Sequence, residues 1–490
     1  MEIIELLKNL KTQSIHGDLE IEINQIQFDS RKIAKNDAYV ALKGTVADGH
    51  QFIKQAIQDG AKLIVCEKLP VFLESHITYI QVEDTAQALG KLAGNFYGNP
   101  SKKLKLIGVT GTNGKTTVVT ILYKLFKKLG YNVGLISTIH NKIKSRIYPS
   151  THTTPNPVEL NRLLAEMVKK RCTHVFMEVS SHAIVQKRIE GLHFKGGVFT
   201  NISHDHLDYH GTFSDYIRAK KGFFDILPHT SFALVNQDDK RGLVMLQNCK
   251  AKHVTFSMKS MSDYKVRIMD SSFEGMQLQI EEKHNEKING KETWTKLIGN
   301  FNAYNLLTVY AVAMLLEEDE DEILTELSNI KGVNGRFQRY TSSLGVHTIV
   351  DYAHTPDALE NVLKTISEIK KPHQNLITVV GCGGNRDKTK RPEMAKIAAN
   401  YSDWSIFTSD NPRTEKPKAI IKDMLEGVKD VDCSKYQTII LRKEAIERAC
   451  SMAQKDDIIL VAGKGHETYQ EINGERFDFD DRVILKESLE

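Results

Sequence analysis

A short stretch of the chain, VTGTNGKTT, combines glycine, lysine and threonine at a spacing that suits phosphate binding. Gly114, Lys115 and Thr116 match the end of the phosphate-loop pattern G-x-x-x-x-G-K-[ST], whereas Val109 stands where that pattern has its first glycine. Glycines let backbone N–H groups approach phosphates, the lysine can reach the outer phosphates, and a threonine hydroxyl can bind Mg²⁺. The stretch indicates a nucleotide site with a variant opening, the alternative being a plain Gly/Thr-rich turn.

The sequence on both sides of this loop favours the nucleotide interpretation. KLKLIGVT (103–110) is typical of a buried strand, and the residues after the loop predict a helix that ends at Gly130. One face of that helix carries Val118, Ile121, Leu122, Leu125 and Leu129. With YNVGLIST (131–138) as the next strand, the segment predicts a βαβ unit and a parallel sheet, with the positive end of the helix facing the phosphates.

A carboxylate is expected beside the loop. A magnesium nucleotide site usually has an acidic residue at the end of a neighbouring strand, and THVFMEVSSH (173–182) is an apolar strand pattern that reaches Glu178. A buried, unpaired carboxylate would be costly there, and a metal ion would compensate it. The alternative is an ordinary exposed strand end.

Histidines and aspartates gather after a further apolar strand pattern. The cluster consists of His204, Asp205, His206, Asp208 and His210. Three interpretations stay open from the residues alone: a zinc site, a general acid–base group, or a solvated polar loop. Histidines spaced by two and four residues do not define a metal site without a third ligand.

Strand and helix patterns alternate again after residue 340. HTIVDYA (347–353), NLITVVG (375–381), DWSIFTS (403–409) and DIILVAG (457–463) are typical of strands, with helical patterns such as 357–369 and 392–400 between them. Candidate binding residues fall at or after the C-terminal ends of these strands, namely Arg386, Asn411, Arg413, Gly463, His466 and Glu467. Open α/β sheets bind ligands at the carboxyl ends of their strands, so a binding site is predicted at this edge.

The bulk composition narrows the class of protein. A chain of 490 residues is too long for one core, so several domains are expected, with a linker at GNPSKKLK (98–105) and a softer boundary at 331–338. A net charge of +4 with no long basic block argues against nucleic acid, and no apolar run is long enough for a membrane helix or a signal peptide. Six scattered cysteines, with no C-x-x-C pair, favour a reduced cytoplasm over disulfides or a zinc knuckle.

Nine motifs occur in a fixed order along the chain: VTGTNGKTT, EVSSH, TNISHDHLDYHGTFSDYIRAK, LIGNFNAYNLL, GRFQ, DYAHTPD, GCGGNRDKTKRP, SDNPRTE and VAGKGHETYQ. Together they resemble the Mur ligases of bacterial cell-wall synthesis, whose phosphate loop opens T-G-T-N-G-K-T-[ST] and so accounts for Val109. The resemblance implies three α/β domains: a UDP-substrate-binding domain (1–100), a central ATP-binding domain with a mostly parallel sheet (101–335), and a Rossmann-like domain that receives an amino acid (336–490).

The resemblance also implies a reaction. ATP would activate the D-glutamyl carboxylate of UDP-N-acetylmuramoyl-L-alanyl-D-glutamate as an acyl phosphate, and an amino acid would attack it through a tetrahedral intermediate, releasing ADP and phosphate. The implied cofactors are ATP and Mg²⁺, and the implied partners are small molecules, with no nucleic acid and no membrane. A cytoplasmic monomer serving peptidoglycan synthesis is expected. The rivals are a folylpolyglutamate-synthase-like ligase and a catalytically silent nucleotide-binding protein.

By resemblance, one Mg²⁺ is held by Thr116 and Glu178, and a second metal by His206 and Lys220. Lys220 would be carbamylated to N6-carboxylysine, which turns an ammonium into an anion that can bind a cation. The implied catalytic residues are Lys115, Glu178, His206 and Lys220. From the residues alone, an ordinary lysine on a helix surface is the preferred interpretation of Lys220, and Lys221 beside it could be mistaken for it.

The remaining implied contacts are those to the nucleotide and the UDP-substrate. ATP-binding residues would be Gly111, Thr112, Asn113, Gly114, Lys115, Thr116, Thr117, Asn302, Asn305, Arg336, Asp351 and His354. UDP-substrate-binding residues would be Ser30, Thr153, Thr154, Ser180, Gln186 and Arg188, with DGHQF (48–52) as a second uridine-side loop. Arg188 also has a physical case as a bidentate donor to a carboxylate or phosphate, the alternative being a helix-surface charge. The family usually has proline where Asn334 stands, so a fixed φ is missing from this hinge.

The implied amino-acid-binding residues are Arg386, Asn411, Arg413, Gly463 and Glu467. The two candidate amino acids, meso-diaminopimelate and L-lysine, differ by one carboxylate at the far end of the side chain. A lysine site should not place a cation beside the ε-ammonium, because like charges repel. DNPR is the family's signature for diaminopimelate, so Arg413 is expected to bind the distal carboxylate and Glu467 the distal ammonium, with L-lysine as the alternative.

Overall fold

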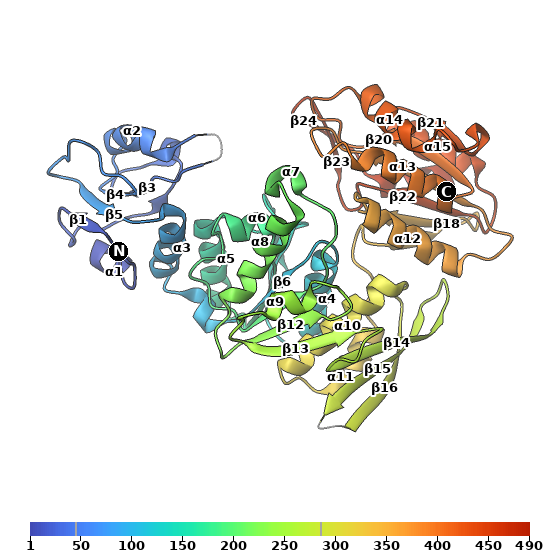
Figure 1. Ribbon diagram of the computed structural model, residues 1–490, viewed down its shortest axis with the longest axis horizontal. Helices are drawn as coiled ribbons and strands as arrows, with labels where there is room; N and C mark the ends of the chain where they lie inside the picture. Colours follow the sequence, from blue (N-terminus) through green and yellow to red (C-terminus); the bar gives the residue numbers. More distant parts are fainter. Residues whose placement is uncertain (45–46, 285–286) are drawn as a thin grey trace.

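The computed structural model describes residues 1–44, 47–284 and 287–490. Three main sheets follow one another along the chain, and Figure 1 shows them as a row in which the central sheet lies between the other two. Each sheet is mostly parallel and is covered by helices, which confirms the predicted α/β class.

The N-terminal sheet has the order β1-β5-β4-β3-β2, and β1 runs antiparallel to its neighbour. Its strands are β1 (Ser14–His16), β2 (Ile26–Gln27), β3 (Ala38–Val40), β4 (Leu63–Cys66) and β5 (Thr78–Gln81). The helices of this part are α1 (Ile3–Leu6), α2 (Ile53–Gln58) and α3 (Thr85–Phe96), with the 3-10 turns η1 (Ser30–Lys32) and η2 (Gly49–Phe52).

The central sheet has the order β16-β15-β14-β13-β12-β11-β6-β10-β7-β8-β9. Its parallel strands are β6 (Lys105–Thr110), β7 (Val133–Ile136), β10 (His174–Glu178), β11 (Gly196–Phe199), β12 (Phe232–Asn236), β13 (Lys252–Ser257) and β14 (Tyr264–Ser271). Antiparallel strands extend both edges: β8 (Asn141–Ile143), β9 (Arg146–Tyr148), β15 (Met276–His284) and β16 (Lys287–Thr295). The helices are α4 (Lys115–Lys128), α5 (Pro157–Lys169), α6 (Ser181–Val185), α7 (Leu207–His210), α8 (Phe213–Asp225), α9 (Gly242–Leu246), α10 (Asn300–Leu315) and α11 (Glu320–Ser328).

The C-terminal sheet has the order β17-β18-β22-β19-β20-β21, with β17 antiparallel. Its strands are β17 (Gln338–Thr341), β18 (His347–Asp351), β19 (Leu376–Cys382), β20 (Trp404–Ser409), β21 (Tyr436–Thr438) and β22 (Ile458–Ala462), and β23 (Tyr469–Ile472) pairs separately with β24 (Glu475–Asp478). The helices are α12 (Pro356–Ile369), α13 (Lys390–Tyr401), α14 (Pro417–Leu425), α15 (Arg442–Met452) and α16 (Asp481–Leu489), with the 3-10 turns η4 (Glu426–Val428) and η5 (Cys433–Lys435).

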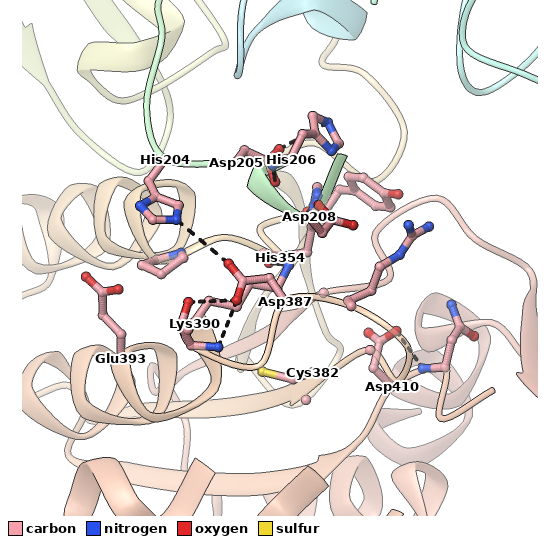
Figure 2. Close-up of a pocket in the computed structure, with 18 of the residues that line it drawn as sticks. His204, Asp205, His206, Asp208, His354, Cys382, Asp387, Lys390, Glu393 and Asp410 are labelled. Atoms are coloured by element: carbon pink, nitrogen blue, oxygen red, sulfur yellow. Dashed lines mark hydrogen bonds and ion pairs between the residues drawn. The ribbon is translucent and has the colours of Figure 1, made fainter. Parts of the chain in front are cut away.

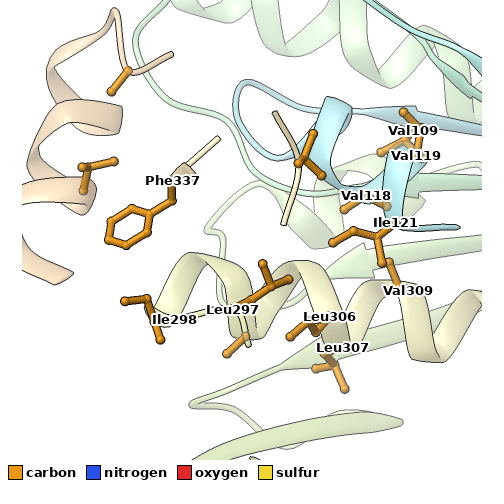
Figure 3. Close-up of a cluster of buried hydrophobic side chains, with 14 of the residues drawn as sticks. Val109, Val118, Val119, Ile121, Leu297, Ile298, Leu306, Leu307, Val309 and Phe337 are labelled. Carbon is orange, nitrogen blue, oxygen red and sulfur yellow. The ribbon is translucent and has the colours of Figure 1, made fainter. Parts of the chain in front are cut away.

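A continuous apolar core fixes the helix that follows the phosphate loop. The predicted inward face of α4, including Val118 and Ile121, is buried against β6 and α10 (Figure 3). Phe337, next to the start of the C-terminal sheet, joins the same cluster and lies 5.6 Å from the Phe301 ring, centroid to centroid. The core therefore fixes the position of the phosphate loop relative to the first residues of the C-terminal sheet.

The predicted first linker is more ordered than a plain connector. Residues 100–103 form the 3-10 turn η3 (Pro100–Lys103), Pro100 and Ser101 are buried, and the turn packs against α5. Ser101 Oγ accepts a hydrogen bond from His193 N, which ties the segment to the central part. Within the described residues, all six cysteines are free and no helix is long and apolar enough to cross a membrane.

Candidate active site

The lysine of the phosphate loop forms hydrogen bonds to the backbone of the same loop. Gly111 has a φ of 148°, and a Cβ at this position would lie 1.9 Å from Thr200 Oγ1, so only glycine fits. Lys115 Nζ donates to the carbonyl oxygens of Gly111 and Thr112, each over 2.8 Å. Burial lowers the pKa of Lys115, and the nearby carboxylate of Glu178 opposes that shift. The loop therefore presents a half-buried cation where a phosphate chain would bind.

A cavity of about 310 Å³ opens beside this loop, between the central sheet and α12. Eight of the expected nucleotide residues line it: Asn113, Gly114, Thr117, Asn302, Asn305, Arg336, Asp351 and His354. The other four, Gly111, Thr112, Lys115 and Thr116, belong to the same loop and the first turn of α4. The cavity is also lined by side chains that the sequence did not single out, among them Asp238, Tyr304 and Asp357.

Arg336 reaches from the C-terminal part of the chain to the phosphate loop. Its Nη2 donates to Thr116 Oγ1 at 3.2 Å, its guanidinium lies 4.4 Å from the centre of the Tyr352 ring, and its buried Nε has no hydrogen-bond partner among the described residues. Burial raises the pKa of Asp351 to about 6, although Arg336 opposes this. An arginine with a buried free donor, held over a phosphate loop, suits an anionic ligand.

Glu178 lies one strand away from the phosphate loop, since β10 pairs it with Val109 of β6. Its side chain is 1% exposed, so the alternative of an exposed strand end is wrong. The two carboxylate oxygens accept from Thr138, Oε1 from the backbone N at 2.8 Å and Oε2 from Oγ1 at 3.2 Å. No described residue forms an ion pair with this buried carboxylate, which leaves its charge available to a cation.

Lys220 is buried beneath the phosphate loop. It is 1% exposed, Nζ donates to Gly111 O at 2.8 Å, and it lies 4.7 Å from the centre of the Tyr216 ring. Among the described residues, no carboxylate lies within ion-pair distance of Nζ, whereas Lys221 pairs with Asp225. Burial and the charge of Lys115 lower the pKa of Lys220 well below its ordinary value. The surface-lysine alternative is therefore wrong, and the surroundings of Lys220 shift its equilibrium toward the neutral amine.

The histidine–aspartate segment forms a partly buried loop that leads into α7. His206 has a φ of 56° and its Nε2 lies 3.3 Å from Asp205 Oδ2. Burial lowers the pKa of His206 to about 3, so the ring is neutral near pH 7 with a lone pair available. Groups of three His, Cys, Asp or Glu side chains able to hold a metal do not occur in the described part of the chain, so the zinc interpretation has no support.

The expected substrate residues of the central part lie together beside Glu178. Arg188 donates from Nη1 to Thr154 O at 2.9 Å and from Nε and Nη2 to Gln186 Oε1 at 3.0 and 2.6 Å. Thr154 Oγ1 donates to Glu178 O at 2.8 Å and accepts from Ser180 N at 3.1 Å. Arg188 follows the end of α6 rather than lying on a helix surface.

Two sequence features lie apart from this group. Ser30 starts η1 in the N-terminal part and lines neither of the two cavities described here. The DGHQF segment forms η2, in which Asp48 caps the turn by accepting from His50 N. His50 Nε2 in turn accepts from Glu67 N at 2.9 Å, which gives this histidine a role in holding the turn against β4.

A second cavity, of about 410 Å³, lies at the carboxyl ends of β18, β19, β20 and β22. The structure brings five expected amino-acid residues to it: Arg386, Asn411, Arg413, Gly463 and Glu467. Figure 2 shows His204 facing Asp387 across this cavity, with Nε2 and Oδ2 3.8 Å apart. Thr153 and His206 also line it, so it joins the C-terminal sheet to the central part.

Arg413 and Glu467, the basic and the acidic residue expected to select the amino acid, have different hydrogen-bond partners. Arg413 has a φ of 50°, and its Nη1 donates to Gly384 O at 2.8 Å. Glu467 accepts at Oε2 from Asn411 Nδ2 at 2.8 Å and from Lys464 Nζ at 3.0 Å. Both side chains line one cavity, which therefore offers a cation and an anion to the same ligand.

Family comparisons agree with this arrangement. Residues 22–97 match the family model described as "Mur ligase family, catalytic domain", residues 109–313 the "Mur ligase middle domain", and residues 335–465 the "Mur ligase, glutamate ligase domain". A curated relative from Cytophaga hutchinsonii is 54% identical over 491 residues, covering 100% of this chain and 99% of the relative. The chain belongs to the Mur ligase family. It is thus an ATP-dependent ligase that acts on small-molecule substrates.

The relatives of this Mur ligase carry specific names. The Cytophaga protein is named UDP-N-acetylmuramoyl-L-alanyl-D-glutamate--2,6-diaminopimelate ligase. A solved structure with the same name is 29% identical, has a TM-score of 0.71, and the match covers 100% of this chain and 98% of that one. A MurF ligase from Thermotoga maritima, solved in complex with ADP, is 19% identical with a TM-score of 0.62 over 90% of this chain and 94% of that one, and shares the fold.

Some site residues of this Mur ligase were missed from the sequence. Lys464, Asp410 and Lys390 lie inside the motifs GKGHE, SDNPR and RDKTK, so their presence in those motifs was the available signal. Lys390 Nζ donates to His354 O at 3.0 Å. His466, in contrast, was expected at the sheet edge but lines neither cavity, and its buried Nδ1 has no hydrogen-bond partner among the described residues.

Proposed function

We propose that this Mur ligase adds meso-diaminopimelate to UDP-N-acetylmuramoyl-L-alanyl-D-glutamate and releases ADP and phosphate, as the name of its Cytophaga relative describes. The observation that carries the proposal is the presence of Arg413 and Glu467 in one cavity. The distal end of meso-diaminopimelate has a carboxylate and an ammonium, which these two side chains complement. L-Lysine lacks the carboxylate, so it would leave Arg413 facing a cation or empty space.

ATP is proposed to bind in the smaller cavity. Arg336 and the phosphate loop would hold the phosphates, Asp351 the ribose, and Asn302 and Asn305 would lie near the base. Support comes from the buried Arg336 Nε, which has no hydrogen-bond partner in the described part of the chain, and from the hydrogen bonds of Lys115 to the loop backbone. The γ-phosphate and the D-glutamyl carboxylate are both anions, so their approach needs concentrated positive charge, and Lys115 supplies part of it.

Magnesium is the proposed metal, and the donors present fit it. Glu178 and Thr116 offer carboxylate and hydroxyl oxygens, the ligands that Mg²⁺ prefers. Glu178 is buried, and no ion pair to it is found among the described residues. A bound Mg²⁺ would neutralise negative charge on the phosphates during transfer. A second metal is proposed to take the neutral ring of His206 and the carbamate of Lys220.

Carbamylation of Lys220 is supported by its surroundings. Only an unprotonated amine can add CO₂, and burial beside Lys115 favours that form of Lys220. The product would be an anion within the reach of Gly111 and Tyr216, which now contact Nζ. The buried carbamate would need a cation to compensate its charge, and the proposed second metal is that cation.

The UDP-substrate is proposed to extend from Ser30 to the group around Arg188. Residues 1–100 would bind the UDP end, residues 101–335 would bind ATP, and residues 336–490 would bind the amino acid. Thr153, Thr154, Ser180 and Gln186 would hold the peptide beside Glu178. We further propose a cytoplasmic monomer, because each step uses small molecules and side chains of one chain.

The deciding experiment measures ADP release with each substrate omitted in turn. Release should need both the UDP-dipeptide and an amino acid, and kcat/KM should be higher for meso-diaminopimelate than for L-lysine. A higher value for L-lysine would overturn the choice of amino acid. Release that depends on a folate substrate would indicate a folylpolyglutamate-synthase-like ligase, and no substrate-dependent release would indicate a silent nucleotide-binding protein.

A further inference from the structure

Lys464 is a buried cation directly behind the amino-acid cavity. Its side chain has no exposed surface, and Nζ donates to Asn411 Oδ1 and Glu467 Oε2, each over 3.0 Å. Nζ also lies 5.5 Å from the centre of the Tyr469 ring. Burying an ammonium is costly unless its protons find partners. The contacts of Lys464 therefore bear directly on the two side chains that it binds.

The ammonium of Lys464 determines the orientation of the Asn411 side-chain amide. Lysine has donors and no acceptor, so only Asn411 Oδ1 can face Nζ. Glu471 N donates to the same oxygen at 2.9 Å, which fixes that choice a second time. The Nδ2 group of Asn411 must then face Glu467, where it donates to Oε2 at 2.8 Å.

Both of these donors reach the same oxygen of Glu467. Oε2 accepts from Lys464 and from Asn411, whereas none of the described residues donates to Oε1. The Glu467 side chain is 15% exposed and lines the cavity. Oε1 is therefore the oxygen available to a ligand, and the two donors on Oε2 set the direction in which it points.

The formal charge at this corner of the cavity suits an incoming ammonium. Asp410 is buried beside Gly463, where an added Cβ would lie 2.6 Å from Asp410 Oδ2. Asp410, Glu467 and Lys464 together supply two carboxylates and one ammonium, while the guanidinium of nearby Arg442 is paired with Asp481. Burial, then Asp410, raise the pKa of Glu467, and Lys464 opposes this rise. Further groups that act on or respond to Glu467 are Arg442, Tyr352 and Tyr469.

We propose that Lys464 is a positioning residue for amino-acid selection. It clamps Oε2 of Glu467 and orients Asn411, so that Oε1 is presented to the distal ammonium of the incoming amino acid. This inference rests on the proposed function, and it assigns a role to a lysine that does not itself touch the substrate.

The test compares Lys464→Met with the wild-type chain in the ADP-release assay. KM for meso-diaminopimelate should rise about ten-fold or more, because Glu467 loses both its clamp and its compensating cation. KM for ATP and for the UDP-dipeptide should change less than about two-fold, because the residues proposed to bind these two substrates are unchanged in this variant. The acid limb of kcat/KM for meso-diaminopimelate should move to higher pH, because Glu467 without Lys464 takes up a proton more readily. A parallel rise in all three KM values, or an unmoved pH limb, would overturn the proposal.

A second comparison isolates the path through Glu467. In a Glu467→Gln background, adding Lys464→Met should change KM for the amino acid by less than about two-fold, because no carboxylate is left to position. A full additive loss would show that Lys464 acts otherwise. Thermal unfolding checks that each variant is folded. The double variant Lys464→Met/Glu467→Gln removes both charges of the pair. Its comparison with Glu467→Gln therefore remains decisive even if Lys464→Met alone does not fold.

A third ligand separates this inference from the proposed function. The inhibition constant of 2-aminopimelate, which lacks the distal ammonium, should be insensitive to Lys464→Met. A rise equal to that for meso-diaminopimelate would contradict the role at Oε1. If the wild-type chain instead prefers L-lysine, the proposed function fails, but L-lysine also has a distal ammonium and its KM should still rise in Lys464→Met.

Discussion

Asn113 of the phosphate loop donates from Nδ2 to Asp357 Oδ2 over 2.8 Å, although 244 positions separate the two residues. Asp357 lies in the first turn of α12, and the same oxygen accepts from Ser203 Oγ at 3.1 Å. Asp357 lines both cavities. One carboxylate therefore joins the loop proposed to hold ATP to the part of the chain proposed to receive the amino acid.

Replacing this carboxylate should weaken nucleotide binding. In Asp357→Ala the Asn113 amide and the Ser203 hydroxyl lose their acceptor, at a cost of about 1–3 kcal/mol. KM for ATP should rise accordingly, while Asp357→Asn, which keeps one carbonyl acceptor, should show a smaller rise. An unchanged KM for ATP in Asp357→Ala would mean that the contact contributes nothing to the ATP-bound form.

Removing the Arg413 guanidinium should damage amino-acid selection. In Arg413→Ala a buried carboxylate of the ligand would lose its cation, and kcat/KM for meso-diaminopimelate should fall by about 2–4 kcal/mol, or roughly 30- to 1,000-fold. The value for L-lysine should fall much less. Arg413→Lys serves as the control that keeps charge without the planar fork. Equal losses for both amino acids would argue against a contact to the distal carboxylate.

Activity should depend on carbon dioxide through Lys220. Lys220→Ala should lose at least about 100-fold in kcat, because it can form no carbamate to hold a metal, and a short carboxylic acid should restore part of the activity. Lys221→Ala, at the neighbouring residue that pairs with Asp225, should retain activity. NMR with ¹³C-bicarbonate should detect a carbamate carbon in the wild type. Its absence from fully active enzyme would contradict carbamylation.

Asp351 should give the folded state a defined pH dependence. Its pKa is raised from 3.8 to about 6, so the folded state binds the proton more tightly than the unfolded state. Its unfavourable contribution is absent below about pH 4, grows as pH rises to about 6, and reaches on the order of 3 kcal/mol above that. Asp351→Asn should therefore gain stability relative to wild type across this interval, measured by denaturant unfolding. The exposed Asp430→Asn control should show no such trend.

Arg442 and Asp481 form a pair with no exposed side-chain surface. Arg442 donates through Nε and Nη2 to the two carboxylate oxygens at 2.8 Å, and Nη2 also reaches Ala462 O at 3.0 Å. Arg442→Met leaves a buried carboxylate uncompensated and should lower stability by about 3–5 kcal/mol. The double variant Arg442→Met/Asp481→Leu should recover part of this loss. A double variant as unstable as the single one would mean that the Ala462 contact dominates.

Much of the fold was predictable because its signals are local. The apolar face of α4 and each of the strand patterns ending near Glu178, Ser409 and Ala462 can be recognised within its own short stretch of sequence. Parallel strands then bring their carboxyl ends to one edge of a sheet. The edge strands β14 to β16, which pair antiparallel with one another, were not anticipated, because long half-exposed strands alternate weakly. The linker at 98–105 was expected as a plain connector, although its proline and serine are buried against α5.

The sequence by itself determined the α/β class, the phosphate loop and the family, because those depend on residue types and short spacings. Only the tertiary structure decided that Lys220 is a buried amine under the loop, that Asn113 meets Asp357, and that Lys464 and Asn411 share one oxygen of Glu467. Burial and hydrogen bonding depend on which distant segments pack together, and no local pattern contains that information. Most of the contacts that support the chemistry proposed for this chain join distant segments, as between Asn411 and Glu467.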